Sequence, residues 1–268
     1  MILALVVSLL AGLATSVGGL LAMHRRTLER EVLAVALAFA AGAMLLVSFV
    51  QILPLGIEWM AETQPLMAAQ AIVYLAFFAG IALVLIIDRF LPSSMNPSEI
   101  EGREAALTDS DATHNLRLLR SGLLVAMVLG LHNFPEGMAT FFTTYQDPTV
   151  GITLAVAIAI HNVPEGIAVA APVYAATKSR RKALRWATVS GLMEPLGGLV
   201  AAAVISWVVP DAFFGIFYGL VAGMMVFLAL DELLQASWRY QTDKHQTIYG
   251  MLAGMAIVVV SLVLFTAA

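Results

Sequence analysis

Long runs of apolar residues, separated by short polar segments, dominate the chain from one end to the other. Each run has about 20 residues or more, the length that a helix needs to cross the hydrocarbon core of a bilayer. The runs lack the alternation of polar and apolar positions that marks a membrane β-strand. The sequence therefore predicts an all-α fold of eight transmembrane helices, at residues 3–23, 31–53, 68–87, 121–145, 150–174, 183–209, 212–234 and 248–267.

The composition supports this fold class. Hydrophobic residues make up 60% of the 268 residues and charged residues only 12%, about half the charged fraction of an ordinary soluble domain. The chain has no cysteine, which excludes disulfides and thiolate metal ligands. Because no basic segment precedes the first apolar run, we interpret that run as the first span and not as a cleaved signal.

The basic residues are distributed unevenly along the chain. All fourteen Lys and Arg residues lie in or beside the connections that follow spans one, three, five and seven. Positive residues accumulate on the cytoplasmic side of a membrane, so we predict that these connections are cytoplasmic and that both termini face outside. The alternation holds through all connections only for eight spans, so topology and helix count support each other.

One long connection interrupts what is otherwise a single domain covering residues 1–268. Residues 88–120 carry charges of both signs, include Pro92, Pro97 and Gly102, and have no apolar period. This composition predicts a mobile cytoplasmic linker. His114 is its one histidine, which is too little to predict a metal sensor.

A six-residue motif occurs twice in the middle of the chain. Residues 132–137 and residues 161–166 both read His-Asn-x-Pro-Glu-Gly, each about eleven residues into its predicted span. At ~1.5 Å rise per residue, both copies lie close to the bilayer midplane. Consecutive spans run in opposite directions, so the copies form an antiparallel pair, a recurring arrangement in transporters.

Acidic residues inside the spans point to cation binding. Glu136, Glu165 and Glu194 lie deep in spans four, five and six, where no Lys or Arg neutralises them. On the translocon scale three such acids cost roughly 8–10 kcal/mol, so they must hold protons or bind cations. In each motif the His and the Glu are four residues apart and share one helix face.

Imidazole and carboxylate together are a ligand set for zinc and other first-row divalent metals. Each motif proline also frees the backbone carbonyl four residues earlier, at Leu131 and Ile160. The candidates exceed what one tetrahedral zinc needs, which favours a two-position site with bridging carboxylates for an ion that must leave again. The predicted metal site consists of His132, Asn133, Glu136, His161, Asn162, Glu165 and Glu194.

A second set of polar residues marks a candidate pathway. Met44, Ser48 and Gln51 recur on one face of span two, where Met44 is either a thioether ligand or plain packing. Gln51 either lines the pathway or bonds between helices. Asp231 and Glu232, at the cytoplasmic end of span seven, either receive the departing ion or are solvated.

The twin motif and the eight spans resemble the ZIP (Zrt/Irt-like) family of divalent metal transporters, most closely its bacterial zinc-uptake branch. The resemblance covers nearly the whole chain. It implies import of zinc first, and of Fe2+, Mn2+, Co2+ or Cd2+ more weakly, across the bacterial cytoplasmic (inner) membrane. It also implies a homodimer, an elevator-like movement of spans one, four, five and six, and ligands at the seven positions above with Met44 and Gln51 beside them.

Two features depart from that family pattern. Gln51 stands where close bacterial relatives are expected to have glutamate, and residues 88–120 lack a His-rich run. The first departure weakens a ligand or proton carrier in span two. The second makes metal sensing by the loop doubtful. Neither touches the twin motif.

Two other functions remain as alternatives. An intramembrane metalloprotease normally shows His-Glu-x-x-His, whereas Asn follows each histidine here and cannot act as the base. A receptor would bind the metal without moving it. We expect no enzymatic activity, no catalytic cofactor and no nucleic-acid partner; the expected partners are metal ions, the lipid bilayer and a second copy of the chain.

Overall fold

The computed structural model describes residues 1–90, 111–205 and 210–266, and every regular element in these ranges is helical. Most of the segment predicted to be a mobile linker lies outside the described residues, as do the ends of spans six and eight. The elements are α1 (Ile2–Leu21), η1 (Arg25–Leu28), α2 (Arg30–Val47), η2 (Ser48–Ile52), α3 (Leu53–Ala61), α4 (Leu66–Phe90), α6 (Asp111–Gln146), α7 (Pro148–Thr177), α8 (Arg180–Gly191), α9 (Met193–Ile205), α10 (Asp211–Leu228), η3 (Ala229–Leu233), α11 (Leu234–Tyr240) and α12 (Gln246–Thr266).

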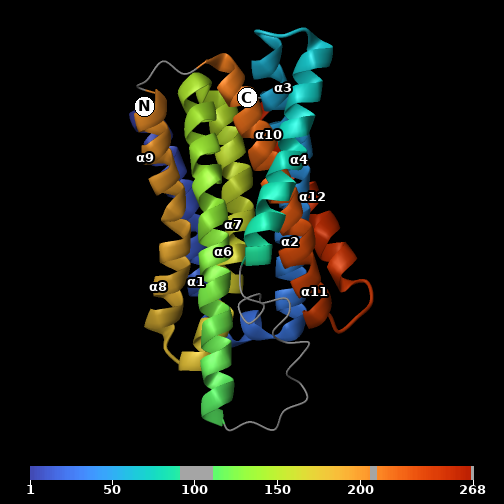
Figure 1. Ribbon diagram of the computed structural model, residues 1–268. Coiled ribbons are helices and arrows are strands. Elements are labelled where there is room, and N and C mark those ends of the chain that lie inside the picture. Colours follow the sequence, from blue (N-terminus) through green and yellow to red (C-terminus); the bar gives the residue numbers. More distant parts are fainter. Residues whose placement is uncertain (91–110, 206–209, 267–268) are drawn as a thin grey trace.

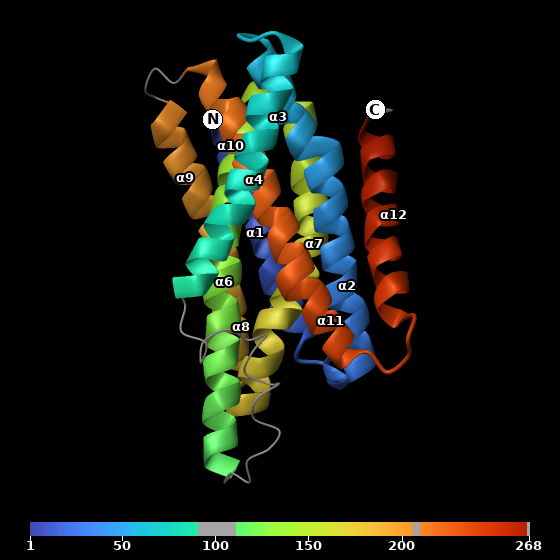
Figure 2. The ribbon, with the colours of Figure 1, turned by 45° about the vertical axis from the view of Figure 1, so that its right-hand side comes forward.

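The helices form an elongated bundle with the architecture of a multi-pass membrane protein (Figure 1). Within the described residues, seven helical stretches are long and apolar enough to cross a bilayer. The eighth is α6, which runs alongside α7 through the full depth of the bundle (Figure 2). The predicted all-α bundle of eight spans is therefore confirmed.

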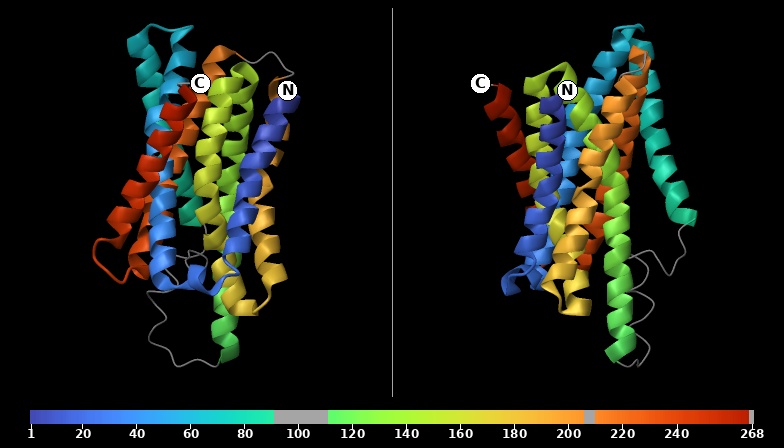
Figure 3. Two further views of the ribbon diagram at one scale, coloured as in Figure 1. Left: turned by 180° about the vertical axis from the view of Figure 1, so that it is seen from behind. Right: turned by 90° about the vertical axis from the view of Figure 1, so that its left-hand side faces the viewer.

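Both chain ends lie at one end of this bundle (Figures 1 and 3). The described connections that carry basic residues, between α1 and α2, between α7 and α8, and between α11 and α12, lie at the opposite end. By the positive-inside rule, the basic end is cytoplasmic and the termini face outside. We call these the inner and outer ends.

Several helix bounds differ from those predicted. α6 begins at Asp111 rather than at residue 121, so the last ten residues of the predicted linker are helical. Span two continues beyond residue 53 through α3 to Ala61, and Pro54 is accommodated directly after the π turn of η2. Hydropathy alone locates the apolar part of a helix and misses its polar extensions.

Spans two and seven each contain a π-helical turn. η2 and η3 both follow a helix of 18 residues and are both five residues long. A π turn inserts an extra residue and turns the helix face that follows it, and such turns are frequent at functional sites. Gln51 lies in η2, and Asp231 and Glu232 lie in η3.

Span six is broken into two helices. α8 ends at Gly191 and α9 begins at Met193, with Glu194 in the first turn of α9. Pro195 has no N–H for the carbonyl four residues earlier, which ends the hydrogen-bond ladder at this point. Transporters commonly place ion sites at helices interrupted in this way.

Glycines divide the bundle into two tightly packed groups. A Cβ at Gly12 or Gly18 of α1 would collide with the backbone of α8 or α7, and one at Gly197 of α9 with the backbone of α6. A Cβ at Gly42 of α2 would collide with α12, and one at Gly223 of α10 with α4. Every close approach at a described glycine joins helices of one group.

We name the two sets the first group (α1, α6, α7, α8 and α9) and the second group (α2, α3, α4, α10, α11 and α12, with η2 and η3). The first group lies on the left of Figure 1 and the second on the right. The groups meet mainly where α7 packs against α2, with smaller contacts of α7 with α12 and of α6 with α10.

Candidate metal site

The seven predicted ligands come together within the first group, half-way along α6 and α7 and at the break in span six. All of them are buried, and none is more than 2% exposed. His132, Asn133 and Glu136 come from α6, His161, Asn162 and Glu165 from α7, and Glu194 from α9. The antiparallel pairing of the two motifs is the pairing that the sequence predicts.

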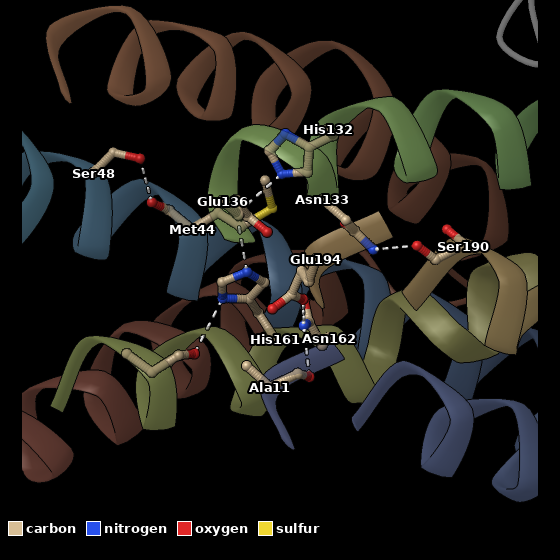
Figure 4. Close-up of polar contacts among 11 residues, drawn as sticks. Ala11, Met44, Ser48, His132, Asn133, Glu136, His161, Asn162, Ser190 and Glu194 are labelled. Carbon is tan, nitrogen blue, oxygen red and sulfur yellow. Dashed lines mark hydrogen bonds and ion pairs between the residues drawn. The ribbon is translucent and has the colours of Figure 1, made fainter. Parts of the chain in front are cut away.

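Glu136 is at the centre of this cluster (Figure 4). Its Oε1 atom is 3.1 Å from Nε2 of His132 on the same helix and 3.4 Å from Nε2 of His161 on the facing helix. The carboxylate thus links the two motifs through both imidazoles. The same three side chains offer two nitrogens and one carboxylate, which is a borderline-soft ligand set suited to zinc.

His161 is oriented by a backbone carbonyl. Its Nδ1 atom lies 3.1 Å from the carbonyl oxygen of Ala157, one turn earlier in α7. A carbonyl can only accept, so Nδ1 carries a hydrogen and Nε2 is the ring nitrogen directed into the cluster. A second-sphere bond of this kind fixes the tautomer and the ring orientation of metal-binding histidines.

The two motif asparagines are oriented in the same way by backbone carbonyls of neighbouring helices. Nδ2 of Asn133 donates to the carbonyl of Ser190 over 3.3 Å, and Nδ2 of Asn162 donates to that of Ala11 over 3.0 Å. In each amide the Oδ1 atom has no hydrogen-bond partner among the described residues. An aspartate could not donate these bonds, so the structure explains why both positions are Asn.

Glu194 and Glu165 complete the cluster. The second N–H of Asn162 donates to Oε1 of Glu194, which ties α7 to α9. The other oxygen of Glu194 and both carboxyl oxygens of Glu165 have no hydrogen-bond partner among the described residues. Buried carboxyl oxygens without partners are costly, so these groups lower the stability of the fold instead of adding to it.

The last residue of each motif is glycine because other backbones pass against it. A Cβ at Gly137 would collide with the carbonyl of Glu194, and one at Gly166 would collide with the carbonyl of Thr15 in α1. The close approach at Gly137 sets the distance between α6 and α9. The motif therefore supplies both the ligands and the packing that brings Glu194 to them.

The ligands do not converge on one point in this conformation. Within the described residues, no group of three or more His, Asp or Glu side chains is arranged to hold a metal ion. The reason lies in the contacts above: Glu136 faces the histidines, and Glu194 faces Asn162. For the predicted ligands to share one ion, these carboxylates would have to rotate.

The candidate pathway residues of span two have different environments. Met44 is fully buried, and its sulfur is directed toward Glu136 and the two histidines (Figure 4). The hydroxyl of Ser48 instead donates to the carbonyl of Met44 over 2.7 Å. Gln51 is 8% exposed, and its Oε1 atom has no hydrogen-bond partner in the described part of the chain.

Asp231 and Glu232 lie in η3 rather than in this cluster. Both are half-buried, and Asp231 accepts a hydrogen bond of 2.9 Å from Nε2 of Gln235. They belong to the second group, as Met44 and Gln51 do. The predicted pathway residues therefore all come from the second group, and of these Met44 reaches toward the seven predicted ligands.

Sequence reasoning missed the groups that orient the ligands. The carbonyls of Ala11, Ala157 and Ser190 carry no signal in a sequence. The hydroxyl of Ser8 donates to the carbonyl of Glu194 over 3.0 Å and holds α1 against α9. The one sequence feature that hints at this contact is the presence of a polar residue, Ser8, in an apolar span.

Comparison with known proteins shows the family of this chain. Residues 91–262 match the family described as ZIP zinc transporter. The chain belongs to the ZIP family. It is 46% identical to the zinc transporter ZupT of Corynebacterium aurimucosum over 258 residues, which cover 96% of this chain and 95% of that protein.

Two further relatives give the same result over nearly their whole length. The zinc transporter ZupT of Corynebacterium glutamicum is 44% identical over 266 residues, 99% of this chain and 100% of that protein. The zinc transporter ZupT of Oceanobacillus iheyensis is 43% identical over 268 residues, 98% of each chain. The family resemblance predicted from the twin motif is confirmed, and the metalloprotease alternative is excluded because ZIP proteins are transporters.

Proposed function

We propose that this ZIP protein imports zinc ions across the bacterial cytoplasmic membrane through the site formed by the twin motifs and Glu194. One observation carries the proposal: buried imidazole, amide and carboxyl groups from α6, α7 and α9 face one another, and several of their oxygens have no hydrogen-bond partner in the part of the chain that the structure describes. The bacterial relatives compared above are zinc transporters, which supports zinc as the main substrate.

The ligand set of this site suits a transported ion, which must bind and then be released. Four or five of the seven groups can serve one ion while the others hold a second position, with Glu136 and Glu165 able to bridge the two. The ligands are weak and shared, unlike the closed set of a structural zinc, and conduction requires binding that is reversible. Nitrogen and oxygen donors also accept Fe2+, Mn2+, Co2+ and Cd2+, so we propose that these ions are carried more weakly.

The two helix groups support an elevator-like movement. Close glycine packing binds the helices of each group to one another, and it does not cross the boundary between the groups. The seven ligands all belong to the first group, whereas Met44 and Gln51 belong to the second. We propose that the first group carries the ion past the second, and that two copies of the chain assemble as a homodimer.

Zinc flux by the purified protein tests the function. Wild-type protein reconstituted into liposomes that contain a zinc indicator should give saturable zinc uptake above protein-free vesicles. An excess of Mn2+ should compete poorly, and whole cells that express the protein should accumulate zinc if the direction is inward. Zinc binding without flux would favour the receptor alternative, and tenfold stronger uptake of Mn2+ would contradict the proposed order.

A cross-link within the first group tests the rigid-body movement. The hydroxyls of Ser16 in α1 and Thr188 in α8 are 3.1 Å apart. Since the chain has no cysteine, a Ser16→Cys, Thr188→Cys pair can be oxidised selectively. If α1 and α8 move together, zinc uptake should stay within about twofold of the reduced protein. Loss of flux that returns on reduction would show that these helices move apart during transport.

A further inference from the structure

A buried hydrogen bond joins the two helix groups near their outer ends. Oγ1 of Thr143 in α6 and the phenol oxygen of Tyr218 in α10 are 2.8 Å apart, and these residues are 4% and 1% exposed. Thr143 also donates to the carbonyl of Ala139 over 2.8 Å. A hydroxyl has one hydrogen to donate, so Tyr218 must be the donor to Thr143.

Aromatic side chains surround this bond on the same two helices. Phe142, next to Thr143, is fully buried. Its ring centroid lies 5.2 Å from that of Phe214, 5.5 Å from Phe217 and 6.2 Å from Phe213, each at an angle close to perpendicular. Edge-to-face contacts of this kind are favourable. Phe214 in turn contacts Trp59 of α3, with 4.9 Å between their centroids, so the contact reaches further into the second group.

The importance of this contact lies in its position between the two helix groups. Thr143 lies seven residues after Glu136 in α6, or roughly 10 Å toward the outer end at ~1.5 Å per residue. The hydrogen bonds that Ser8, Asn133, Asn162 and Ser237 make to other helices join helices within one group. The Thr143–Tyr218 bond instead crosses the boundary that a moving first group must slide along.

We propose that the Tyr218–Thr143 hydrogen bond and the Phe142 cluster form an outer latch, which must open before an ion from outside reaches the ligands. The latch rests on the movement of the two groups proposed above. In the latched conformation α6 and α10 seal the outer side of the site. Opening the latch breaks the hydrogen bond between Tyr218 and Thr143 and moves the Phe142 ring away from α10. The packing inside each group stays intact.

Thiol labelling from the outer side measures how often the latch opens. Ala139 is fully buried, three residues from Glu136 and four from Thr143, and therefore shares their helix face. In the cysteine-free background, Ala139→Cys is exposed to a membrane-impermeant thiol reagent added outside. Combined with Tyr218→Phe, it should be labelled about fivefold faster than Ala139→Cys alone, a change equivalent to ~1 kcal/mol.

The variant is chosen so that folding is retained. Phenylalanine keeps the ring of Tyr218 and removes only the donor, and Thr143 still donates to the Ala139 carbonyl. Thr143→Val should accelerate labelling more strongly, because it leaves the Tyr218 hydroxyl buried without an acceptor. If the two residues act through one bond, the double variant should label no faster than Thr143→Val alone.

Two control variants should leave the labelling rate unchanged. Thr143→Ser keeps the acceptor, and Tyr145→Phe removes a hydroxyl from an exposed residue at the end of the same helix. Equal labelling rates in wild-type and Tyr218→Phe backgrounds, or no labelling in either, would overturn the latch. The labelling is done without zinc, so this outcome is distinct from a wild-type protein that carries no zinc, which would overturn the proposed function.

Discussion

Replacing His161 and Glu165 together by alanine is expected to reduce saturable zinc uptake into liposomes to the level of protein-free vesicles. His161 is held through Nδ1 by the Ala157 carbonyl, with its Nε2 atom 3.4 Å from Glu136. Glu165 offers two buried carboxyl oxygens that have no hydrogen-bond partner among the described residues. The double variant removes an imidazole and a carboxylate able to bridge two ion positions, and no other described side chain of α7 can replace both.

The same substitution should leave the fold intact. Both carboxyl oxygens of Glu165 lack a hydrogen-bond partner among the described residues, so their removal relieves a desolvation cost. This gain offsets the loss of the His161 contacts to Ala157 and Glu136. Gel filtration and thermal unfolding should therefore resemble those of the wild type. A matched control removes one His and one Glu at exposed positions, His24→Ala with Glu58→Ala, and should keep nearly full uptake. Normal zinc uptake by the His161, Glu165 variant would exclude both residues from the pathway.

The helical spans, and the gathering of the seven candidate side chains at one place, could be predicted from the sequence because both depend on local order. A run of about 20 apolar residues has few ways to satisfy its backbone in lipid other than as a helix. His and Glu four residues apart must share a helix face wherever the helix is placed. The antiparallel order of the two motifs follows from consecutive spans, and Glu194 was found because an unpaired acid in a span is costly.

The remaining features depend on contacts between distant segments. The π turns at η2 and η3 and the break before Glu194 interrupt apolar runs that look continuous in the sequence. The orientation of Asn162 depends on the carbonyl of Ala11, about 150 residues away in the chain. No periodicity encodes such a pairing. Pro135 and Pro164 lie inside the continuous helices α6 and α7, whereas Pro195 lies at the break between α8 and α9.

Hydropathy does not reveal the division into two groups either, because the hydropathy value of a glycine is the same whichever helix it packs against. In the structure each close approach at a glycine identifies the backbone against which that helix is packed. Glycine patterns therefore carry the information on which helices pack closely together, and runs of apolar residues carry the information on how many helices there are. The twin motif contains both kinds of residue, ligands and a packing glycine.

Gly137→Ala is expected to reduce zinc uptake about 100-fold, although the new methyl group touches no metal ligand side chain. A Cβ at this position would collide with the backbone carbonyl of Glu194, and the backbone atoms around that carbonyl would be crowded as well. Backbone cannot rotate away as a flexible side chain can, so α6 and α9 must separate. Displacing a functional group by about 1 Å is enough to lose roughly two orders of magnitude in activity.

Gly130→Ala on the same helix provides the matched control. There the nearest atom to an added Cβ is Cγ of the flexible Met193 side chain, at 3.3 Å, which can move at small cost. Alanine also favours a helix over glycine by about 1 kcal/mol, so Gly130→Ala should keep its uptake and unfold at the same temperature or higher. Gly137→Ala should unfold at a lower temperature, since overpacking against a rigid neighbour costs about 1–3 kcal/mol. If Gly137→Ala kept both its uptake and its thermal stability, the approach of α9 to α6 would not be what brings Glu194 into the site.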